Sequence, residues 1–327
     1  MSKTKHLITL LLGMFFMAGA CAAWTPERPI EFIVTSGAGG GTDIFTRAIQ
    51  SVIVKNKLID VPILVVTKGG GAGSEGYVYA LGEKANPYRV VFGTNNEYLL
   101  PLVAKMGYAT DDFVPVAAMA LDEFLIWVNE KSPYADARSF IEAARKGDLR
   151  LGGSQSKDMD QTVVSLLSEA TGAKFTYIPF KSGGEAGIQL AGGHIDANTN
   201  NPNESVGQWK GSLVRPLCVF SDKRMAAGPK VTKDKAWSDI PTCRESGIPA
   251  TYQAPRTLWL PAGVSPDVVS FYTDVLAKVR ETPEWKAYIE RTSQSDVFLT
   301  GEELRKYITQ DSAKAYEVYK REKWLVQ

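Results

Sequence analysis

The chain has 327 residues, of which 44% are hydrophobic and 22% charged, and its formal net charge is +1 at pH 7. A chain of this length can bury large hydrophobic cores and usually forms two domains. Lys and Arg are scattered along it, so the sequence lacks the basic cluster that nucleic acids and anionic membrane surfaces attract, and we expect neither as a partner.

The first residues have the pattern of a secretory signal peptide. Lys3 and Lys5 precede an apolar run from Leu7 to Ala20 that is too short for a comfortable membrane span, and an A-x-A cleavage site follows. We therefore expect residues 1–22 to be removed and the mature protein to be secreted across the inner membrane. Lipidation of Cys21 is the alternative, although the leucine expected three places before a lipidated cysteine is absent.

Two cysteines remain if Cys21 leaves with the signal peptide. Cys218 and Cys243 form an even pair in an oxidising compartment, where disulfides persist. The sequence does not fix the distance between their Cα atoms, so a disulfide and two separate buried thiols both stay open.

The apolar run 30–34 predicts a strand, and residues 35–43 (TSGAGGGTD) predict a glycine loop that opens a helix. Apolar residues then recur at helical spacing up to Ile53. Glycines let the backbone approach a ligand closely, and the helix N-terminus adds partial positive charge. Neither a Walker loop nor a full dinucleotide-binding turn matches this spacing. The stretch therefore predicts an anion site that suits a carboxylate.

Two further strands follow in the same half of the chain. Residues 61–66 predict a strand that leads into a second glycine loop, 68–74, and then a short helix. Residues 89–93 predict the next strand, which ends in the polar turn 94–96. Parallel strands joined by helices place these loops along one sheet edge, where ligands of open α/β sheets bind. We expect the first glycine loop and the polar turn to meet there.

A second set of such units begins after a strand at 124–128 and a helix at 134–146. Further strands are predicted at 149–152, 175–178, 195–199 and 214–220. The loops 153–160 and 179–184 each open a helix, and the tract 200–204 offers uncharged donors and acceptors.

The last part of the chain contains a return crossing at 254–260, after which we expect two closing helices. The first runs from about 266 to 280. The second follows Thr300-x-x-Glu303, which is a capping-box pattern.

Many short segments, each weak alone, occur in one order along the chain. They are Trp24-x-x-Glu27-Arg28-Pro29-Ile30, Ala38 to Asp43, Gly71-Ala72-Gly73, Gly93-Thr94-Asn95, Asp112-Phe113-x-Pro115-Val116-Ala117, Pro179 to Gly184, Leu190 to Asp196, Ile240-Pro241-Thr242, Glu245-Ser246-Gly247 and Pro261-Ala262-Gly263. Together they resemble the periplasmic binding proteins of tripartite tricarboxylate transporters, the Bug family.

The resemblance implies an α/β fold of the two-lobe periplasmic binding protein type (type II-like, Venus flytrap), each lobe a mixed, mostly parallel sheet flanked by helices. Lobe 1 would comprise residues 23–123 and 254–327, and lobe 2 residues 124–253. A small carboxylate would bind in the cleft, favour closure of the lobes and pass to the membrane permease of the transporter. The resemblance also implies that the mature protein is periplasmic, and we expect it to be a monomer.

The candidate ligand-binding residues lie in the first loop, the polar turn, the loops of lobe 2 and the return crossing. They are Ala38, Gly39, Gly40, Gly41, Thr42, Asp43, Thr94, Asn95, Ser154, Gln155, Ser156, Lys181, Gly183, Gly184, Asn200, Asn201 and Arg256.

Several of these candidates have a second interpretation. Arg256 either grips a second carboxylate or forms an interdomain or surface salt bridge. Asp43 is expected to cap its helix, because an ionised side chain repels a carboxylate. Lys181 either pairs with the ligand or is a solvated lysine. Family members commonly carry an aromatic pair where this chain has Pro255 and Arg256, so ligand choice is expected to differ.

Catalysis is not expected. His194 is the only histidine after the signal peptide, and no serine elbow or metal-ligand spacing accompanies it. We expect no cofactor and no metal, and a di- or tricarboxylate or an aromatic dicarboxylate as ligand. The alternatives are a periplasmic sensor partner of a receptor and a secreted α/β enzyme that binds a phosphorylated cofactor at the glycine loop.

Overall fold

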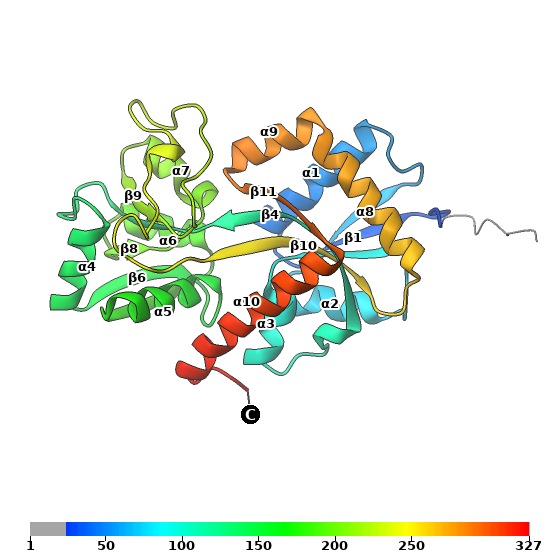
Figure 1. Ribbon diagram of the computed structural model, residues 1–327, viewed down its shortest axis with the longest axis horizontal. Helices are drawn as coiled ribbons and strands as arrows, with labels where there is room; N and C mark the ends of the chain where they lie inside the picture. The colour runs from blue at the N-terminus through cyan, green and yellow to red at the C-terminus, as the bar shows by residue number, and fades with distance from the viewer. Residues whose placement is uncertain (1–23, 327) are drawn as a thin grey trace, which may run out of the picture.

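The computed structural model describes residues 24–326, so the predicted signal peptide and Cys21 lie outside the described residues. Two β-sheets organise this part of the chain, and each is covered by helices, as Figure 1 shows. We refer to the six-stranded sheet and its helices as lobe 1, and to the five-stranded sheet and its helices as lobe 2. No helix within residues 24–326 is long and apolar enough to cross a membrane.

Lobe 1 has the strand order β11-β4-β10-β3-β1-β2. Its strands are β1 (Ile30–Val34), β2 (Ile63–Thr67), β3 (Arg89–Gly93), β4 (Phe113–Glu123), β10 (Gln253–Pro261) and β11 (Ser295–Thr300). Its helices are α1 (Gly41–Lys55), α2 (Ser74–Leu81), α3 (Asn96–Val103), α8 (Pro266–Glu281), α9 (Pro283–Thr292) and α10 (Gly301–Arg321). Short 3₁₀ turns, η1 (Gly71–Gly73) and η2 (Thr110–Asp112), complete it.

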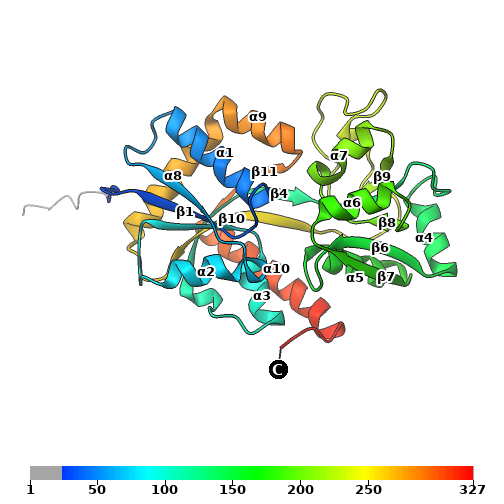
Figure 2. The same ribbon diagram turned by 180° about the vertical axis from the view of Figure 1, so that it is seen from behind.

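Lobe 2 has the strand order β7-β6-β8-β5-β9. Its strands are β5 (Leu125–Asn129), β6 (Leu149–Ser154), β7 (Phe175–Phe180), β8 (Ala197–Asn198) and β9 (Val214–Val219). Its helices are α4 (Ala137–Lys146), α5 (Met159–Thr171), α6 (Gly183–Ala191) and α7 (Pro202–Lys210), with the 3₁₀ turn η3 (Trp237–Asp239). Figure 2 shows both lobes from behind.

Each sheet is the middle layer of a three-layer lobe, because both of its faces are apolar. In lobe 1, α1, α8 and α9 pack on one face through residues such as Phe45 and Trp285, while α2, α3 and α10 cover the other through residues such as Tyr77. In lobe 2, α4 and α5 cover one face and α6 and α7 the other. Trp127, Trp209 and Trp259 are at most 5% exposed, so they are core residues.

Both sheets are mixed and flanked by helices, which confirms the predicted two-lobe α/β fold, but in neither described sheet do parallel pairs outnumber antiparallel ones. β1 pairs in parallel with β2 and β3, and β6 pairs in parallel with β7 and β8, so the loops after these strands share one edge in each lobe. The remaining pairs are antiparallel. The parallel strands therefore carry the glycine loops, and the antiparallel strands connect the lobes.

Two neighbouring strands run between the lobes. β4 and β10 pair antiparallel from Glu123 and Gln253 at one end to Phe113 and Pro261 at the other, and β4 leads through Phe124 directly into β5. Figure 1 shows both strands extending from lobe 1 toward lobe 2. We call this pair of strands the hinge ribbon.

Several elements were not predicted from the sequence, and the expectation of two closing helices was wrong. α8, α9 and α10 follow β10, with β11 between α9 and α10. A local signal for α9 was present, because Thr282 caps it and Pro283 begins it. β11 has no comparable signal, since it forms by pairing with β4. The expected capping box is also wrong: α10 begins after Thr300, but this side chain makes no capping bond.

The polar tract at 200–204 and the polar turn at 94–96 also begin helices that the sequence did not predict. Asn201 is the N-cap residue of α7, and Asn95 is that of α3. β4 was missed too, because its alanine-rich centre has low strand propensity and lies buried between β10 and β11.

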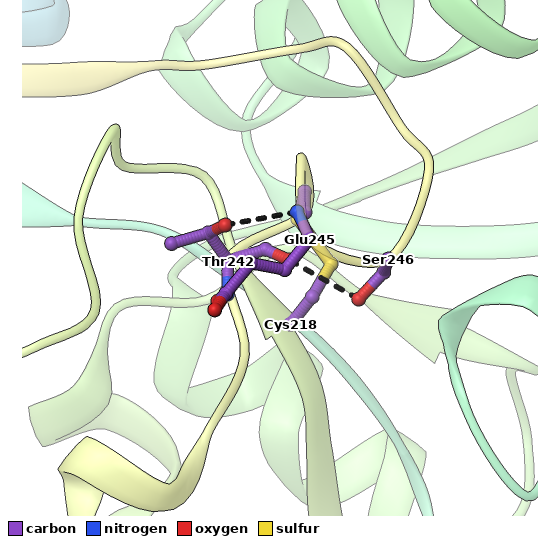
Figure 3. The surroundings of a disulfide bond; sticks show 5 residues. Cys218, Thr242, Glu245 and Ser246 are labelled. Carbon is purple, nitrogen blue, oxygen red and sulfur yellow. Dashed lines mark hydrogen bonds between the residues drawn. A yellow bond between two sulfur atoms is a disulfide. The ribbon is translucent and has the colours of Figure 1, made fainter.

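A disulfide joins Cys218 on β9 to Cys243, and both residues are fully buried (Figure 3). The segment after Cys243 is also fixed by hydrogen bonds. Thr242 Oγ1 accepts from Glu245 N at 3.0 Å, and Ser246 Oγ donates to the Thr242 carbonyl at 3.1 Å. The disulfide therefore anchors the long loop after β9 to the sheet of lobe 2.

We predict that removal of this disulfide destabilises the protein without unfolding it. The bond closes a loop with a sequence separation of 25. Loss of a crosslink of that span costs about 3 kcal/mol, largely because the unfolded chain gains freedom. Urea unfolding of residues 24–327 and of the Cys218→Ala/Cys243→Ala variant measures the difference. Two titratable thiols in the denatured, unreduced wild-type protein would contradict the bond.

Candidate functional site

The first glycine loop joins β1 to α1 and ends in a free helix N-terminus. The N-cap residue of α1 is Gly40, which has no side chain, so no N-cap side chain binds the first amides of the helix. Asp43 instead reaches back: its Oδ2 accepts from Gly39 N at 2.9 Å, and its Oδ1 accepts from Arg47 Nε at 2.9 Å. Asp43 therefore stabilises the loop before the helix and does not cap the first helical amides, which corrects the role expected of it. Its carboxylate is already engaged by the loop and by a cation.

The polar turn after β3 divides between the cleft and the interior. Thr94 is fixed through its carbonyl, which accepts from Thr257 Oγ1 at 3.0 Å. Asn95 is fully buried and donates through Nδ2 to Tyr252 Oη and to Asp311 Oδ2, each at 3.2 Å. Asn95 thus connects the turn to α10 and to Tyr252, the residue before β10, instead of facing a ligand.

The loop after β6 in lobe 2 is held by its own acidic residues. Asp160 Oδ2 accepts from Ser154 N at 2.6 Å and from Ser154 Oγ at 2.8 Å, and Tyr177 Oη donates to the Ser154 carbonyl at 2.8 Å. Asp158 caps α5 by accepting from Met159 N at 2.8 Å. The loop therefore has a fixed shape at the N-terminus of α5.

The loops after β7 and β8 meet at the starts of α6 and α7. Ser182 caps α6 by accepting from Glu185 N at 3.2 Å. Glu204 Oε2 accepts from Asn201 N at 3.1 Å, and Asn201 Nδ2 donates to the Glu123 carbonyl at 2.7 Å. Asn201 therefore links this corner of lobe 2 to the hinge ribbon.

These loops enclose one cavity of about 250 Å³ with walls from both lobes. Figure 2 shows α1 and α6, whose first turns contribute to the walls, beginning near the middle of the molecule from neighbouring lobes. The expected candidates that line it are Gly41, Thr42, Thr94, Ser154, Gln155, Lys181, Gly183, Asn201 and Arg256. The loops predicted from the sequence therefore meet at one cavity.

The other expected candidates do not line this cavity. They are Ala38, Gly39, Gly40, Asp43, Asn95, Ser156, Gly184 and Asn200. Ala38, Gly39 and Ser156 are exposed on the outer side of their loops, while Asn95 and Asn200 are fully buried. Burial turns both asparagines inward: Asn200 Nδ2 donates to the Gly183 carbonyl and to Ser205 Oγ, and so braces α6 and α7.

Several lining residues were not among the expected candidates. They are Thr35, Ser36, Gly37, Gly69, Ala72, Asn96, Phe124, Asp158, Met159, Asp160, Ser182 and Glu204. Most lie in loops that the sequence had indicated. The sequence therefore predicted the right loops but not which of their residues line the cavity. Phe124 has no local sequence signal, because only the passage of the hinge ribbon into lobe 2 brings it to the cavity.

Arg256 reaches the cavity from the hinge ribbon, but its charge is already compensated. Its Nη2 lies 2.5 Å from Asp122 Oδ2, and its Nη1 donates to Thr42 Oγ1 at 2.8 Å. Both charged side chains are less than 10% exposed. A Cβ added to Gly41 would lie 2.4 Å from Arg256 Nη2, so the glycine at the start of α1 makes room for the guanidinium. Only Nε is left buried without a partner.

The acidic residues of the lobe 2 wall have raised pKa values. Burial is the largest cause for each of Asp158, Asp160 and Glu204. It raises the pKa of Glu204 to about 7, and the nearby charges of Asp122 and Asp158 add to the effect. The charge of Glu204 further raises the pKa of Asp160. This wall therefore favours protons or another source of positive charge.

Glu97 lies in α3, directly after the polar turn, and is fully buried. Neither carboxylate oxygen has a hydrogen-bond partner. Burial, and then the charge of Asp111, raise its pKa from 4.5 to about 9. Glu97 is therefore protonated in the folded protein at neutral pH.

We predict that the Asp122–Arg256 pair stabilises the fold only as a pair. Asp122→Ala leaves a buried guanidinium without its counter-charge, which is expected to lower the free energy of unfolding by about 3–5 kcal/mol. The double variant Asp122→Leu/Arg256→Met removes both charges and is expected to lose clearly less. Urea unfolding of both variants measures this. An equal loss in the two variants would contradict the prediction.

We predict a second, pH-dependent effect at Glu97. The folded state holds its proton up to about pH 9, whereas the unfolded chain releases it near 4.5, so the free energy of unfolding falls as pH rises between these values. The slope contributed is at most about 1.4 kcal/mol per pH unit. Glu97→Gln should flatten the decline between pH 7.5 and 9 in urea unfolding, while Glu142→Gln, at an exposed position, should not. Equal slopes in all three proteins would refute the assignment.

Known proteins with a similar sequence or fold agree with this architecture. The family model described as "tripartite tricarboxylate transporter family receptor" (TctC) matches residues 47–323. Protein BugT of Bordetella pertussis is 23% identical over 322 residues, which cover 95% of this chain and 94% of that protein.

Two solved structures show the same fold. A TctC solute-binding protein from Polaromonas, solved without ligand, is 27% identical with a TM-score of 0.75, and the match covers 90% of this chain and 99% of that one. A protein of R. palustris, solved with adipate, is 22% identical with a TM-score of 0.78 and coverages of 90% and 97%. Because the family model spans most of the sequence, this chain belongs to the tripartite tricarboxylate transporter receptor family, TctC.

Proposed function

We propose that this protein is a periplasmic receptor that captures a small carboxylate in the cavity between its lobes and delivers it to the membrane permease of a tripartite transporter. The observation that carries this proposal is the cavity itself, which takes walls from both lobes and includes the start of α1. The adipate in the R. palustris relative supports a carboxylate as the ligand class.

The ligand carboxylate would bind at the lobe 1 wall. The N-terminus of α1 has no side-chain cap, so its amides and the helix dipole favour an anion there. Arg256 adds a positive group behind this wall, with Nε unpartnered. Asp43 does not oppose the anion from inside the cavity, because its carboxylate turns back to Gly39 and Arg47.

Closure would occur about the hinge ribbon. We place the lobe boundaries at 123/124 and 253/254, so that lobe 1 comprises residues 23–123 and 254–327 and lobe 2 residues 124–253. A ligand held by one wall gains contacts with the other only in the closed form, so its binding energy shifts the equilibrium toward closure. The closed receptor would then be the form that docks on the permease.

The sequence indicated a di- or tricarboxylate, with Arg256 as the anchor of a second carboxylate. Adipate, a dicarboxylate, fits that expectation in the R. palustris relative. In this chain, Asp122 and Thr42 occupy both terminal nitrogens of Arg256. A second carboxylate would therefore need another partner in the cavity.

We predict that ligand-stripped protein (residues 24–327) is stabilised by small carboxylates in a thermal-shift screen. A ligand at 100 times its Kd adds about 2.7 kcal/mol to the free energy of unfolding. The screen covers mono-, di- and tricarboxylates and aromatic acids, and calorimetry confirms each hit. Folded, empty protein that ignores every carboxylate would overturn the proposed function.

A matched pair of variants locates the binding site. Gly37 lines the cavity, and a Cβ added there meets no protein atom within 4 Å. Gly37→Val should therefore obstruct the ligand and weaken carboxylate binding at least about tenfold, or 1.4 kcal/mol, at an unchanged melting temperature. Gly147→Val, which also meets no atom within 4 Å but lies outside the cavity, should bind like wild type. Unchanged affinity in both variants would remove this cavity as the site.

A further inference from the structure

The two walls of the cavity differ in their charged groups. The lobe 1 wall has the N-terminus of α1 and Arg256. The lobe 2 wall has Asp158, Asp160 and Glu204, and within residues 24–326 none of these three forms an ion pair with Lys or Arg. Lys181 also lines the cavity, but it is exposed and makes no ion pair among the described residues. Arg256 acts on Glu204 through its charge but is already paired with Asp122. Among the described residues, the three carboxylates of the lobe 2 wall therefore have nearby cations but no ion-pair partner of their own.

Helix capping accounts for only part of this acidic wall. Asp160 engages Ser154 through Oδ2, and Glu204 engages Asn201 N through Oε2. Among the described residues, no hydrogen bond uses Asp160 Oδ1 or Glu204 Oε1. Each of these carboxylates thus performs a local structural role with one oxygen and has the other free.

Asp160 is buried and Glu204 half-buried, and neither free oxygen is among the described buried atoms without a partner, so both oxygens remain accessible from the cavity that these residues line. Asp160 is 4% exposed, and a Cβ added to Gly183 would lie 2.4 Å from Glu204 Oε2, so Glu204 is packed against the start of α6. Buried carboxylates without a cation are unfavourable unless they take up protons. Burial raises the pKa of both groups, which agrees with carboxylates that have no ion-pair partner.

We propose that the ligand carries a protonated amine opposite its carboxylate, and that this ammonium group lies against Asp160 and Glu204 in the lobe 2 wall. The inference rests on the proposed function and narrows its ligand to an amino acid-like zwitterion. A second carboxylate at this place would face two acidic groups and bind only with proton uptake. A metal ion is a poorer counter-charge, because the described residues include no group of three or more His, Cys, Asp or Glu placed to hold one.

Matched ligands test the proposal directly. Butyrate, γ-aminobutyrate and glutarate share one carboxylate and its chain and differ only in carrying hydrogen, ammonium or carboxylate at the far carbon. Calorimetry at pH 7.5 is repeated with the corresponding sets one carbon shorter and one carbon longer. We expect the amino acid to bind at least tenfold tighter than the diacid and the unsubstituted acid in at least one set. A diacid that binds tighter than the amino acid in every set, or equal affinities throughout, would overturn the proposal.

The outcomes also separate this proposal from the proposed function. If carboxylates bind but the amino acids have no advantage, only the ammonium subsite fails. If no carboxylate of any kind binds to folded, ligand-stripped protein, the proposed function fails and the ammonium subsite fails with it.

Amide variants show whether the acidic wall causes the preference. Glu204→Gln keeps the oxygen that caps α7 but removes the charge, so the amino acid-to-diacid affinity ratio should fall at least tenfold. Asp160→Asn gives a second, independent removal if the first variant does not fold. Glu185→Gln is the control, because Glu185 accepts from Lys181 N at the start of α6 but does not line the cavity. A ratio that stays unchanged in both wall variants would refute the subsite.

Discussion

The buried ion pair between Arg256 and Asp122 is the interaction on which the site depends. It joins the two strands of the hinge ribbon, at diagonal positions of their antiparallel pairing, and it lies directly behind the start of α1. A buried pair of this kind gains stability only while both charges and their hydrogen bonds are present. The pair therefore holds the glycine loop, the hinge ribbon and the adjoining wall of the cavity in one arrangement.

The hinge ribbon carries further polar contacts around this pair. Glu123 Oε1 accepts from Gln253 Nε2 at 2.7 Å and from Ser295 Oγ, and its carbonyl accepts from Asn201 in lobe 2. Asp122 also accepts from Gln294. These bonds connect β4, β10, β11 and α7. A rotation of one lobe against the other must therefore change the backbone at positions of the hinge ribbon that lack such bonds, or break some of the bonds.

The cavity combines loops that follow parallel strands in two separate sheets. In each lobe the strand pairing places these loops on one edge, and the hinge ribbon turns the two edges toward each other. Such a site favours a ligand with two different ends, because each wall has its own helix termini and its own charges. The lobe 1 wall presents an uncapped helix start, whereas Asp158 and Ser182 cap two helix starts of the lobe 2 wall.

The sequence by itself determined the fold class, the strands that carry the loops and the glycine loop at α1, because hydrophobic periodicity and glycine placement are local properties. It also placed Thr42, Ser154 and Lys181 in loops that reach the cavity. Only the tertiary structure decided that Asn95 and Asn200 turn inward and that Arg256 is paired, since their partners lie far away in the chain or depend on helix packing. The tertiary structure also decided that β11 forms and that the carboxylates of the lobe 2 wall have raised pKa values. Strand pairing and desolvation arise only when distant segments meet.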